Sequence, residues 1–384
     1  MKNALKIALS QRLAEINASS KAIFLQAADD PEEVVRDLMV KYFPRFATLG
    51  DDKSCQKKIY QMLISIAESA AADIRHLDVL NNFYEKIITR PNWQDVELWQ
   101  NFLNAYAYSL ECFINGECHT QNWPTNKDTN LFDVHITDVK LNNPQTIKVL
   151  ILADNLFVAK RIESEFRNIA HVNLKVLICN NRSIKTKFFL GQVINFLRSK
   201  KKFESLKNFV VQKNIFFTKP LHHPKVVAWL RKQNFSIGLH AMGVIYRQEV
   251  IDSFKLGILN SHIGILPEFR GRSVLEWSLL LGFPPGITVF FIDSGIDTGS
   301  KIIFRYPLDY SSFVGVDAIK KHAFALDGKM FKEAVNKLSL PNFVPQTNEI
   351  AKGKRYYVMS KTLVEIVQQQ LHLAQSPSAF QAVG

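Results

Sequence analysis

Three polar side chains in the second half of the chain have types and spacing suited to acyl-transfer chemistry. Asn260 and His262 are two residues apart at the end of an apolar run, and Asp297 follows 37 residues after Asn260. If a strand continues through this run, its period of two places Asn260 and His262 on one face. An amide N–H and an imidazolium can stabilise a tetrahedral oxyanion, and a His–Asp pair can move a proton near neutral pH. The set suits attack of an amine on a formyl carbonyl.

Each of these residues also has an ordinary structural explanation when it is taken alone. Asn-Ser-His and Asp-Ser-Gly are both common turn sequences, and a lone histidine is more often structural than catalytic. The functional interpretation therefore depends on the ordered combination of Asn260, His262 and Asp297.

The stretch from Leu259 to Gly299 resembles the folate-dependent formyltransferase family, which includes glycinamide ribonucleotide, methionyl-tRNA and sugar-nucleotide formyltransferases. The shared pattern is N-x-H, a Leu-Pro turn, an Arg-Gly turn and a late D-x-G-x-D-x-G, carried here by Asn260, His262, Leu266, Pro267, Arg270, Gly271, Asp293, Gly295, Asp297 and Gly299. Looser similarity extends over residues 146–330. The resemblance implies 10-formyltetrahydrofolate as co-substrate, no metal, and Asn260, His262 and Asp297 as the catalytic residues.

The same resemblance assigns the folate pteridine to two backbone stretches, within residues 242–247 and 293–296. Main-chain N–H and C=O groups there would pair with the edges of the ring, and glycine permits close approach. The residues implied as folate contacts are Gly243, Val244, Tyr246, Asp293, Ser294, Gly295 and Ile296.

Two departures from the family pattern bear on the acceptor. Ile263 and Gly264 stand where many members have Pro-Ser, and Ala153-Asp154-Asn155 replaces a Gly/Ser-rich loop that cradles phosphate. Glycinamide ribonucleotide is therefore not the expected acceptor, and any phosphate must be held elsewhere. Arg270 and Arg272 are the predicted acceptor contacts, since arginine pairs well with phosphate.

These features favour a small and anionic amine acceptor, either an amino sugar nucleotide or an amino-acid-like compound. One alternative is methionyl-tRNA formylation, although the residues after Lys332 are too few for the complete barrel domain of those enzymes. The other alternative is a binding protein that kept the formyltransferase fold without turnover. A tetrahydrofolate-release assay with a panel of amines separates the three.

The elements that must hold these residues form an α/β pattern. Apolar runs such as TIKVLILADN and LKVLICNN alternate with helical stretches across residues 146–332. This alternation predicts a Rossmann-like domain with a mostly parallel sheet, covered by helices on both faces. Ligands of such sheets bind beyond the carboxyl ends of the strands.

Residues 1–115 predict a separate, all-helical N-terminal domain. Asp30 and Pro31 form a helix start signal, and Leu98, Phe102 and Tyr106 recur at helical spacing. Residues 116–145 are rich in turn formers and predict a linker or an edge segment. Residues 333–384 predict a C-terminal extension with one helix, from 362 to 373, and a flexible tail.

Charge is distributed unevenly between these parts. Residues 1–140 carry a net charge of −4, whereas the rest of the chain carries +17. A basic second half attracts anions such as folate carboxylates, nucleotide phosphates and nucleic acid.

The four cysteines are too scattered for a disulfide framework or a zinc site and are expected to be reduced thiols. No apolar run is long enough to cross a bilayer, so a cytoplasmic protein without a membrane partner is expected. A homodimer is the oligomer considered for it.

Overall fold

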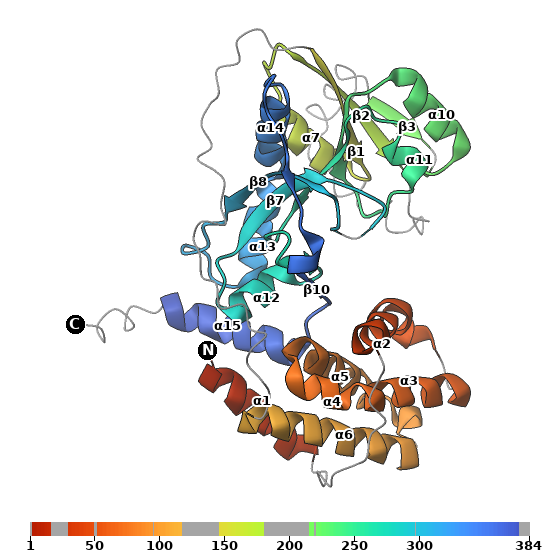
Figure 1. The fold of residues 1–384 in the computed structure, drawn as a ribbon, viewed down its shortest axis with the longest axis vertical. Coiled ribbons are helices and arrows are strands. Elements are labelled where there is room, and N and C mark those ends of the chain that lie inside the picture. Colours follow the sequence, from red (N-terminus) through yellow and green to blue (C-terminus); the bar gives the residue numbers. More distant parts are fainter. Residues whose placement is uncertain are drawn as a thin grey trace, which may run out of the picture.

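The computed structural model describes residues 2–16, 30–49, 52–94, 96–116, 146–179, 215–218, 220–295 and 297–375. A group of N-terminal helices lies at one end of the molecule and an α/β unit at the other (Figure 1). The C-terminal helix α15 (Lys361–Gln375) lies beside the N-terminal helices rather than beside the sheet. The first and last helices of the described chain are therefore neighbours.

The N-terminal unit is entirely helical within its described residues. Its α-helices are α1 (Lys2–Ile16), α2 (Pro31–Asp37), α3 (Lys53–Ser65), α4 (Ala67–Ala72), α5 (Ile74–Ile87) and α6 (Val96–Asn115). A π-turn (Leu38–Tyr42) and two 3-10 turns (Phe43–Thr48 and Pro91–Trp93) complete it. The predicted start at Asp30 is confirmed, because its carboxylate accepts a hydrogen bond of 3.1 Å from the Glu33 N–H.

Aromatic side chains fill the centre of the helical unit. Phe102 and Tyr106, predicted from their helical spacing, are both fully buried on α6 and stack with their ring centroids 5.8 Å apart. Helix α5 is buried along nearly its whole length, since other helices pack on one side and the C-terminal segment on the other. The aromatic residues predicted at helical spacing therefore belong to the core of the helical unit rather than to a ligand site.

The α/β unit is built on an eight-stranded sheet in the order β3-β2-β1-β4-β5-β7-β8-β9. The strands are β1 (Ile147–Ala153), β2 (Val172–Cys179), β3 (Ile215–Thr218), β4 (Ile237–Ala241), β5 (Gly257–His262), β7 (Gly286–Phe291), β8 (Lys301–Pro307) and β9 (Gln346–Thr347). The strands from β3 to β5 run parallel, which confirms the predicted mostly parallel sheet. Strands β7, β8 and β9 add an antiparallel half.

Helices cover both faces of this sheet, as the alternating side chains of β1 require. Val149 and Ile151 point to the face packed by α7 (Leu156–Glu165) and α14 (Asp327–Leu338). Leu150 and Leu152 point to the face packed by α10 (Pro224–Gln233) and α11 (Gln248–Ile251). Because both faces are covered, β1 is apolar and buried from Val149 to Ala153.

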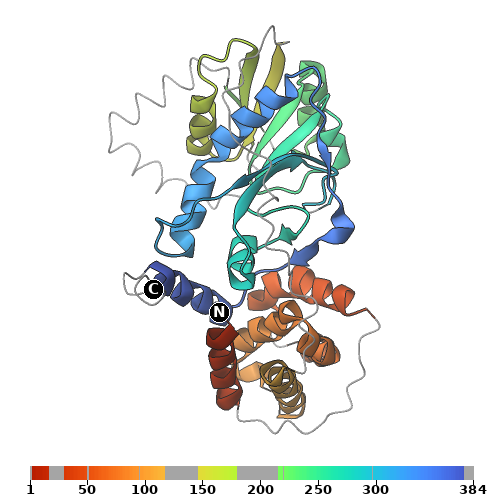
Figure 2. The same cartoon turned by 60° about the vertical axis from the view of Figure 1, so that its left-hand side comes forward.

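A short second sheet and two helices join the α/β unit to the N-terminal helices. Strand β6 (Phe269–Gly271) pairs in parallel with β10 (Lys354–Tyr356), and α12 (Val274–Leu281) follows β6 and contacts α15. Figure 2 shows α15 in blue beside the red α1, with α12 above them. The Trp277 indole donates a hydrogen bond of 3.0 Å to the Tyr357 carbonyl, which fixes α12 to this junction.

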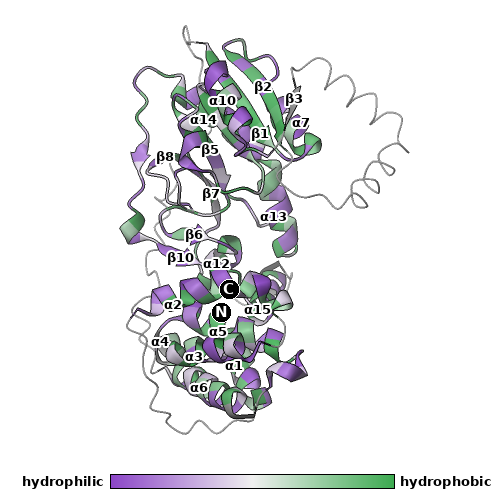
Figure 3. Cartoon of the chain, turned by 90° about the vertical axis from the view of Figure 1, so that its right-hand side faces the viewer, coloured by the Kyte–Doolittle hydropathy of each residue, from purple (hydrophilic) through white to green (hydrophobic). Residues whose placement is uncertain are grey.

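Polar contacts bind the N-terminal unit to the same junction. The Glu85 carboxylate accepts hydrogen bonds from the Lys361 and Thr362 N–H groups, so α5 supplies the N-terminal cap of α15. The hydrophobic core is continuous from the N-terminal helices through α12 and α15 to one face of the sheet. Figure 3 shows hydrophobic residues, in green, in the helices and strands of both units. Helix α13 (Val316–Ala325) also packs on this side.

Most sequence predictions at the level of elements are met, with one correction. Helix α12 buries Trp277, Glu276 and Ser278 because it lies between the sheet unit and α15. Arg270 and Gly271 were expected in a turn, but they belong to β6. The predicted domain limits remain a prediction, and residues 117–145 and 376–384 lie outside the described chain. None of the described helices is long and apolar enough to span a membrane.

Candidate functional site

Strand β5 carries two of the three predicted catalytic residues at its carboxyl end. Asn260 pairs with Phe290 and His262 with Thr288 of the antiparallel strand β7, so both side chains share one face, as predicted. The intervening Ser261 belongs to the opposite face, toward α14. Asn260 is half-buried, whereas the His262 side chain is only 9% exposed.

Both ring nitrogens of His262 have a partner. Nε2 lies 3.0 Å from the Phe269 carbonyl oxygen, which can only accept, so Nε2 carries the hydrogen. Nδ1 lies 3.6 Å from Oδ1 of Asp297. The ring is therefore held between β6 and the Asp297 carboxylate, and a second proton on its Nδ1 would face a negative charge.

Gly264 makes this arrangement of His262 possible. A Cβ atom at position 264 would lie 2.6 Å from His262 Nε2 and 2.9 Å from the Phe269 carbonyl oxygen. In this chain a side chain at position 264 would therefore require a shift of His262 or Phe269. The Thr288 hydroxyl fixes the same turn, since it donates to the Gly264 carbonyl and accepts from the Leu266 N–H.

Asp297 reaches the site by a route that the sequence did not predict. Strand β7 runs antiparallel to β5, so the carboxyl ends of the two strands lie at opposite edges of the sheet. The segment after β7 folds back, and Asp297 adopts the left-handed conformation with φ 52°. Its Oδ2 accepts a hydrogen bond of 3.1 Å from the Gly271 N–H, which ties this carboxylate to β6.

The segment before Asp297 is a tight turn organised by Asp293. The Asp293 carboxylate accepts hydrogen bonds from the Gly295 N–H at 2.9 Å and from the Thr298 hydroxyl at 2.7 Å. A Cβ at position 295 would lie 1.9 Å from the Thr298 hydroxyl oxygen, so the turn requires glycine. Ser294 and Gly295 are exposed, whereas Ile296 lies outside the described residues.

The second predicted folate-contact segment, residues 242–247, follows β4. The His222 imidazole donates from Nε2 to the Ile245 carbonyl at 3.0 Å, and the buried Tyr246 hydroxyl lies 2.9 Å from His240 Nδ1. Gly243 is exposed, Val244 is half-buried, and Ile245 is 65% exposed. His222 therefore holds the main chain of this loop and His240 holds its Tyr246 side chain, while the Ile245 side chain remains accessible.

His240 is a candidate site residue that sequence reasoning missed. It is the last residue but one of β4, next to the 242–247 loop. Burial lowers its pKa to about 4, against the opposing effect of the Asp297 and Asp154 carboxylates. The ring is therefore neutral at physiological pH. A histidine at the carboxyl end of a parallel strand was the available signal.

The two arginines predicted to contact the acceptor occupy different environments. Arg270 is half-buried on β6, and its pKa is lowered by burial and by the neighbouring Arg355. Arg272 is exposed beyond the end of β6. Arg270 is therefore next to the residue that holds Asp297, whereas Arg272 faces solvent.

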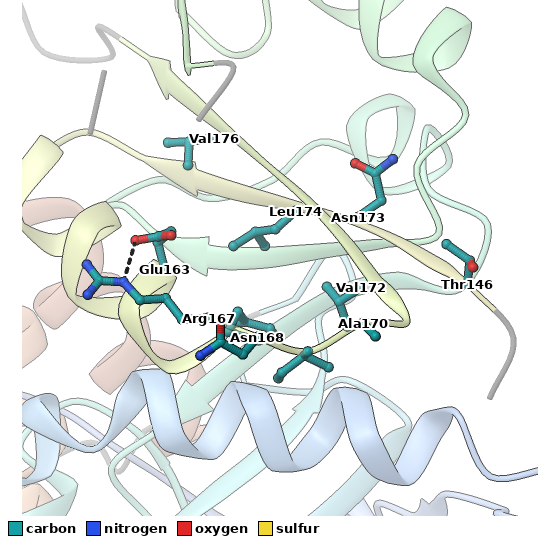
Figure 4. Close-up of a pocket in the computed structure, with 11 residues that line it drawn as sticks. Thr146, Glu163, Arg167, Asn168, Ala170, Val172, Asn173, Leu174 and Val176 are labelled. Carbon is teal, nitrogen blue, oxygen red and sulfur yellow. Dashed lines mark ion pairs between the residues drawn. The ribbon is translucent and has the colours of Figure 1, made fainter. Parts of the chain in front are cut away.

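Two further features lie away from this site. A hollow of about 680 Å³ is lined by residues of α7, of β2 and of the segment between them, among them Glu163 and Arg167, whose charged groups are 3.7 Å apart (Figure 4). Glu32, Asp73 and His76 form a cluster of possible metal ligands, but the Arg75 guanidinium pairs with both carboxylates there. Burial opposes the charging of Glu32, yet His76 and Arg75 lower its pKa to about 2.

The segment that holds the His262–Asp297 pair is similar to known formyltransferases. A methionyl-tRNA formyltransferase of Elusimicrobium minutum is 34% identical over 113 residues, which cover 29% of this chain and 34% of that protein. One of Acetivibrio thermocellus is 27% identical over 152 residues, or 38% of this chain and 49% of that protein. The chain spans about a third of the length of the first curated relatives.

Among solved structures, a 4-N formyltransferase from Francisella tularensis aligns with a TM-score of 0.40 and 16% identity, over 59% of this chain and 88% of that one. The sequence model of the formyl transferase family matches residues 149–308, which include β5, β6, β7 and the turn that carries Asp297. Residues 149–308, less than half of the chain, are therefore similar to the formyl transferase family.

Proposed function

We propose that the chain transfers a formyl group from 10-formyltetrahydrofolate to the amine of a small acceptor. The observation that carries this proposal is the meeting of His262 and Asp297, with Nδ1 and Oδ1 3.6 Å apart, in the segment that matches the formyl transferase family. The proposed catalytic residues are Asn260, His262 and Asp297.

The chemistry of the transfer gives each of these residues a role. The acceptor nitrogen bonds to the formyl carbon, the bond from that carbon to the folate nitrogen breaks, and a proton moves from the amine to the folate nitrogen. The His262–Asp297 pair can accept and return this proton. The Asn260 amide, on the same face of β5, is the donor for the oxygen that becomes negative during the transfer.

The 242–247 loop and the 293–295 turn suit a folate ring. The first offers main-chain groups held by His222 at the Ile245 carbonyl, next to the Ile245 side chain, which is 65% exposed. The second offers main-chain groups of an exposed turn that requires Gly295. A flat heterocycle with polar edges and an apolar face matches this combination.

A second candidate is formylation of methionyl-tRNA. It is favoured by the names of the curated relatives and by the net charge of +17 on the second half of this chain. The positive charge would attract RNA as well as a small anion.

The experiment measures release of tetrahydrofolate from 10-formyltetrahydrofolate with a panel of acceptors, including amino sugar nucleotides, amino acids and charged initiator tRNA. We expect release with a small amine, and we expect His262→Ala and Asp297→Asn to lower kcat by about 10² or more. Folate affinity should stay within a few-fold, because main-chain groups hold the ring.

Three outcomes distinguish the candidates. Release with charged tRNA alone would favour the second candidate. Folate binding without release for any acceptor would favour a binding protein. Normal kcat in a folded His262→Ala variant would refute the assignment of the site.

A further inference from the structure

Two arginines face each other next to the proposed catalytic carboxylate. In the parallel pairing of β6 with β10, Arg355 is the direct partner of Arg270, so their side chains share one face on adjacent strands. Gly271, the residue after Arg270, donates its N–H to Asp297. The arginine pair is therefore built into the element that positions the site.

The pair places like charges together, and the described residues supply no ion pair to either arginine. Among the described residues, Arg270 and Arg355 form no ion pair, and Arg270 Nε is buried without a hydrogen-bond partner. The nearby carboxylates are engaged elsewhere, since Glu32 pairs with Arg75 and His76, and Asp297 with His262. Like charges directly opposite on adjacent strands destabilise a sheet.

The surroundings hold Arg355 in place. The Arg355 guanidinium lies 5.3 Å from the centre of the Tyr357 ring, which supports its position, and the Arg75 guanidinium holds the Arg355 main chain through its carbonyl at 2.9 Å. Helix α2 adds Arg36, whose charge acts on Tyr357. Two arginines, each able to form paired hydrogen bonds with one anion, match a phosphate better than a single carboxylate.

We infer that Arg270 and Arg355 together bind a phosphate group of the small acceptor, at the junction of the β6–β10 sheet with the N-terminal helices. That the bound phosphate belongs to the formyl acceptor rests on the proposed function. The bound phosphate offsets the repulsion between the two guanidinium groups. It also fixes the acceptor beside the His262–Asp297 pair, while Arg272 remains outside the contact.

Direct binding of inorganic pyrophosphate tests the site without requiring turnover. Titration calorimetry would compare the full-length protein with Arg270→Gln, Arg355→Gln and the matched control Lys352→Gln, whose side chain is 68% exposed. We expect saturable binding that weakens at higher salt, at least tenfold weaker binding in each arginine variant, and unchanged binding in the control. Acetate at equal ionic strength should not compete. Equal affinity in all four proteins would overturn the inference.

Kinetics then separate this inference from the proposed function. With a phosphate-bearing acceptor that the enzyme formylates, each arginine variant should raise KM about tenfold or more and spare kcat, because the contact is equal in the ground and transition states. Turnover with an unchanged KM in Arg355→Gln would refute the inference and leave the proposed function standing. Arginine-dependent pyrophosphate binding in a protein that formylates nothing would support the phosphate site and refute the proposed function. Arginine-dependent binding of tRNA but not of pyrophosphate would overturn the small-molecule source of the phosphate.

Discussion

Gly264→Ala should displace His262 while leaving the fold almost intact. Gly264 is not in the left-handed region, so an alanine there brings no backbone strain. Its Cβ would lie 2.6 Å from His262 Nε2, against an ordinary contact of 3.4 Å or more. The imidazole must therefore retreat by about 0.8 Å, because the other close atom is the Phe269 backbone oxygen at 2.9 Å.

This displacement has two consequences of different size. The hydrogen bond from Nε2 to the Phe269 carbonyl, now 3.0 Å, lengthens beyond its useful range and costs about 1 kcal/mol of stability. A catalytic group moved by about 1 Å costs roughly 10² in rate. We therefore expect kcat for formyl transfer to fall by about 10² while the free energy of unfolding changes by only about 1–2 kcal/mol.

Gly238→Ala is the matched control, because its Cβ would meet only the side chains of Ile258 and Phe254, at 3.1 Å. This variant should lose stability without a comparable loss of kcat. Urea unfolding and single-turnover tetrahydrofolate release would be measured for both variants, with the His262 ring signals followed by NMR. A Gly264→Ala enzyme with shifted His262 signals and a kcat within twofold of the parent would refute the assigned role of His262. Unshifted signals would refute the steric reasoning.

Two further predictions concern stability. Gly271 has φ +108°, and a Cβ there would lie 2.2 Å from the Tyr356 carbonyl oxygen, so Gly271→Ala should lower Tm. The loss should exceed that of Gly116→Ala by several degrees, because Gly116 has φ +78° but open space around it. Equal losses in thermal unfolding would contradict a role for the β6–β10 contact. Burial raises the pKa of Asp78 to about 7, so between about pH 4 and 7 the folded protein keeps a proton that the unfolded chain loses, and stability falls as pH rises. Asp78→Asn should therefore be stabilised relative to the parent more at pH 7.5 than at pH 5 in urea unfolding, and a pH-independent difference would show that Asp78 does not titrate in this way.

The sequence was sufficient for those parts of the fold whose signals are local. The helix start at Asp30, the buried stripe of Phe102 and Tyr106, and the apolar strand before Asp154 follow from neighbouring residues alone. The placement of Asn260 and His262 on one face of β5 follows from the period of a strand. Each of these features depends on spacing within a single element.

The sequence was insufficient where a position depends on a partner far along the chain. Arg270 and Gly271 resemble a turn because the strand they pair with, β10, begins at Lys354. The fold-back that brings Asp297 to His262 depends on the antiparallel direction of β7, which apolar composition does not encode. Arg355 had no local signal of function, since only the register of β10 places it beside Arg270.

The N-terminal helices contribute to the site through the backbone of β10. Arg75 is held by Asp73 and Glu32 and donates to the Arg355 carbonyl, so the helical unit fixes this strand at its centre. The next residue, Tyr356, accepts from the Arg272 N–H through its carbonyl and thereby holds the end of β6. Because the Gly271 N–H in turn binds Asp297, a continuous series of hydrogen bonds leads from α5 to the proposed catalytic carboxylate. A shift of the helical unit would therefore move Arg270, Arg355 and the Asp297 carboxylate together. The 242–247 loop, anchored by His222 and His240, would keep its place.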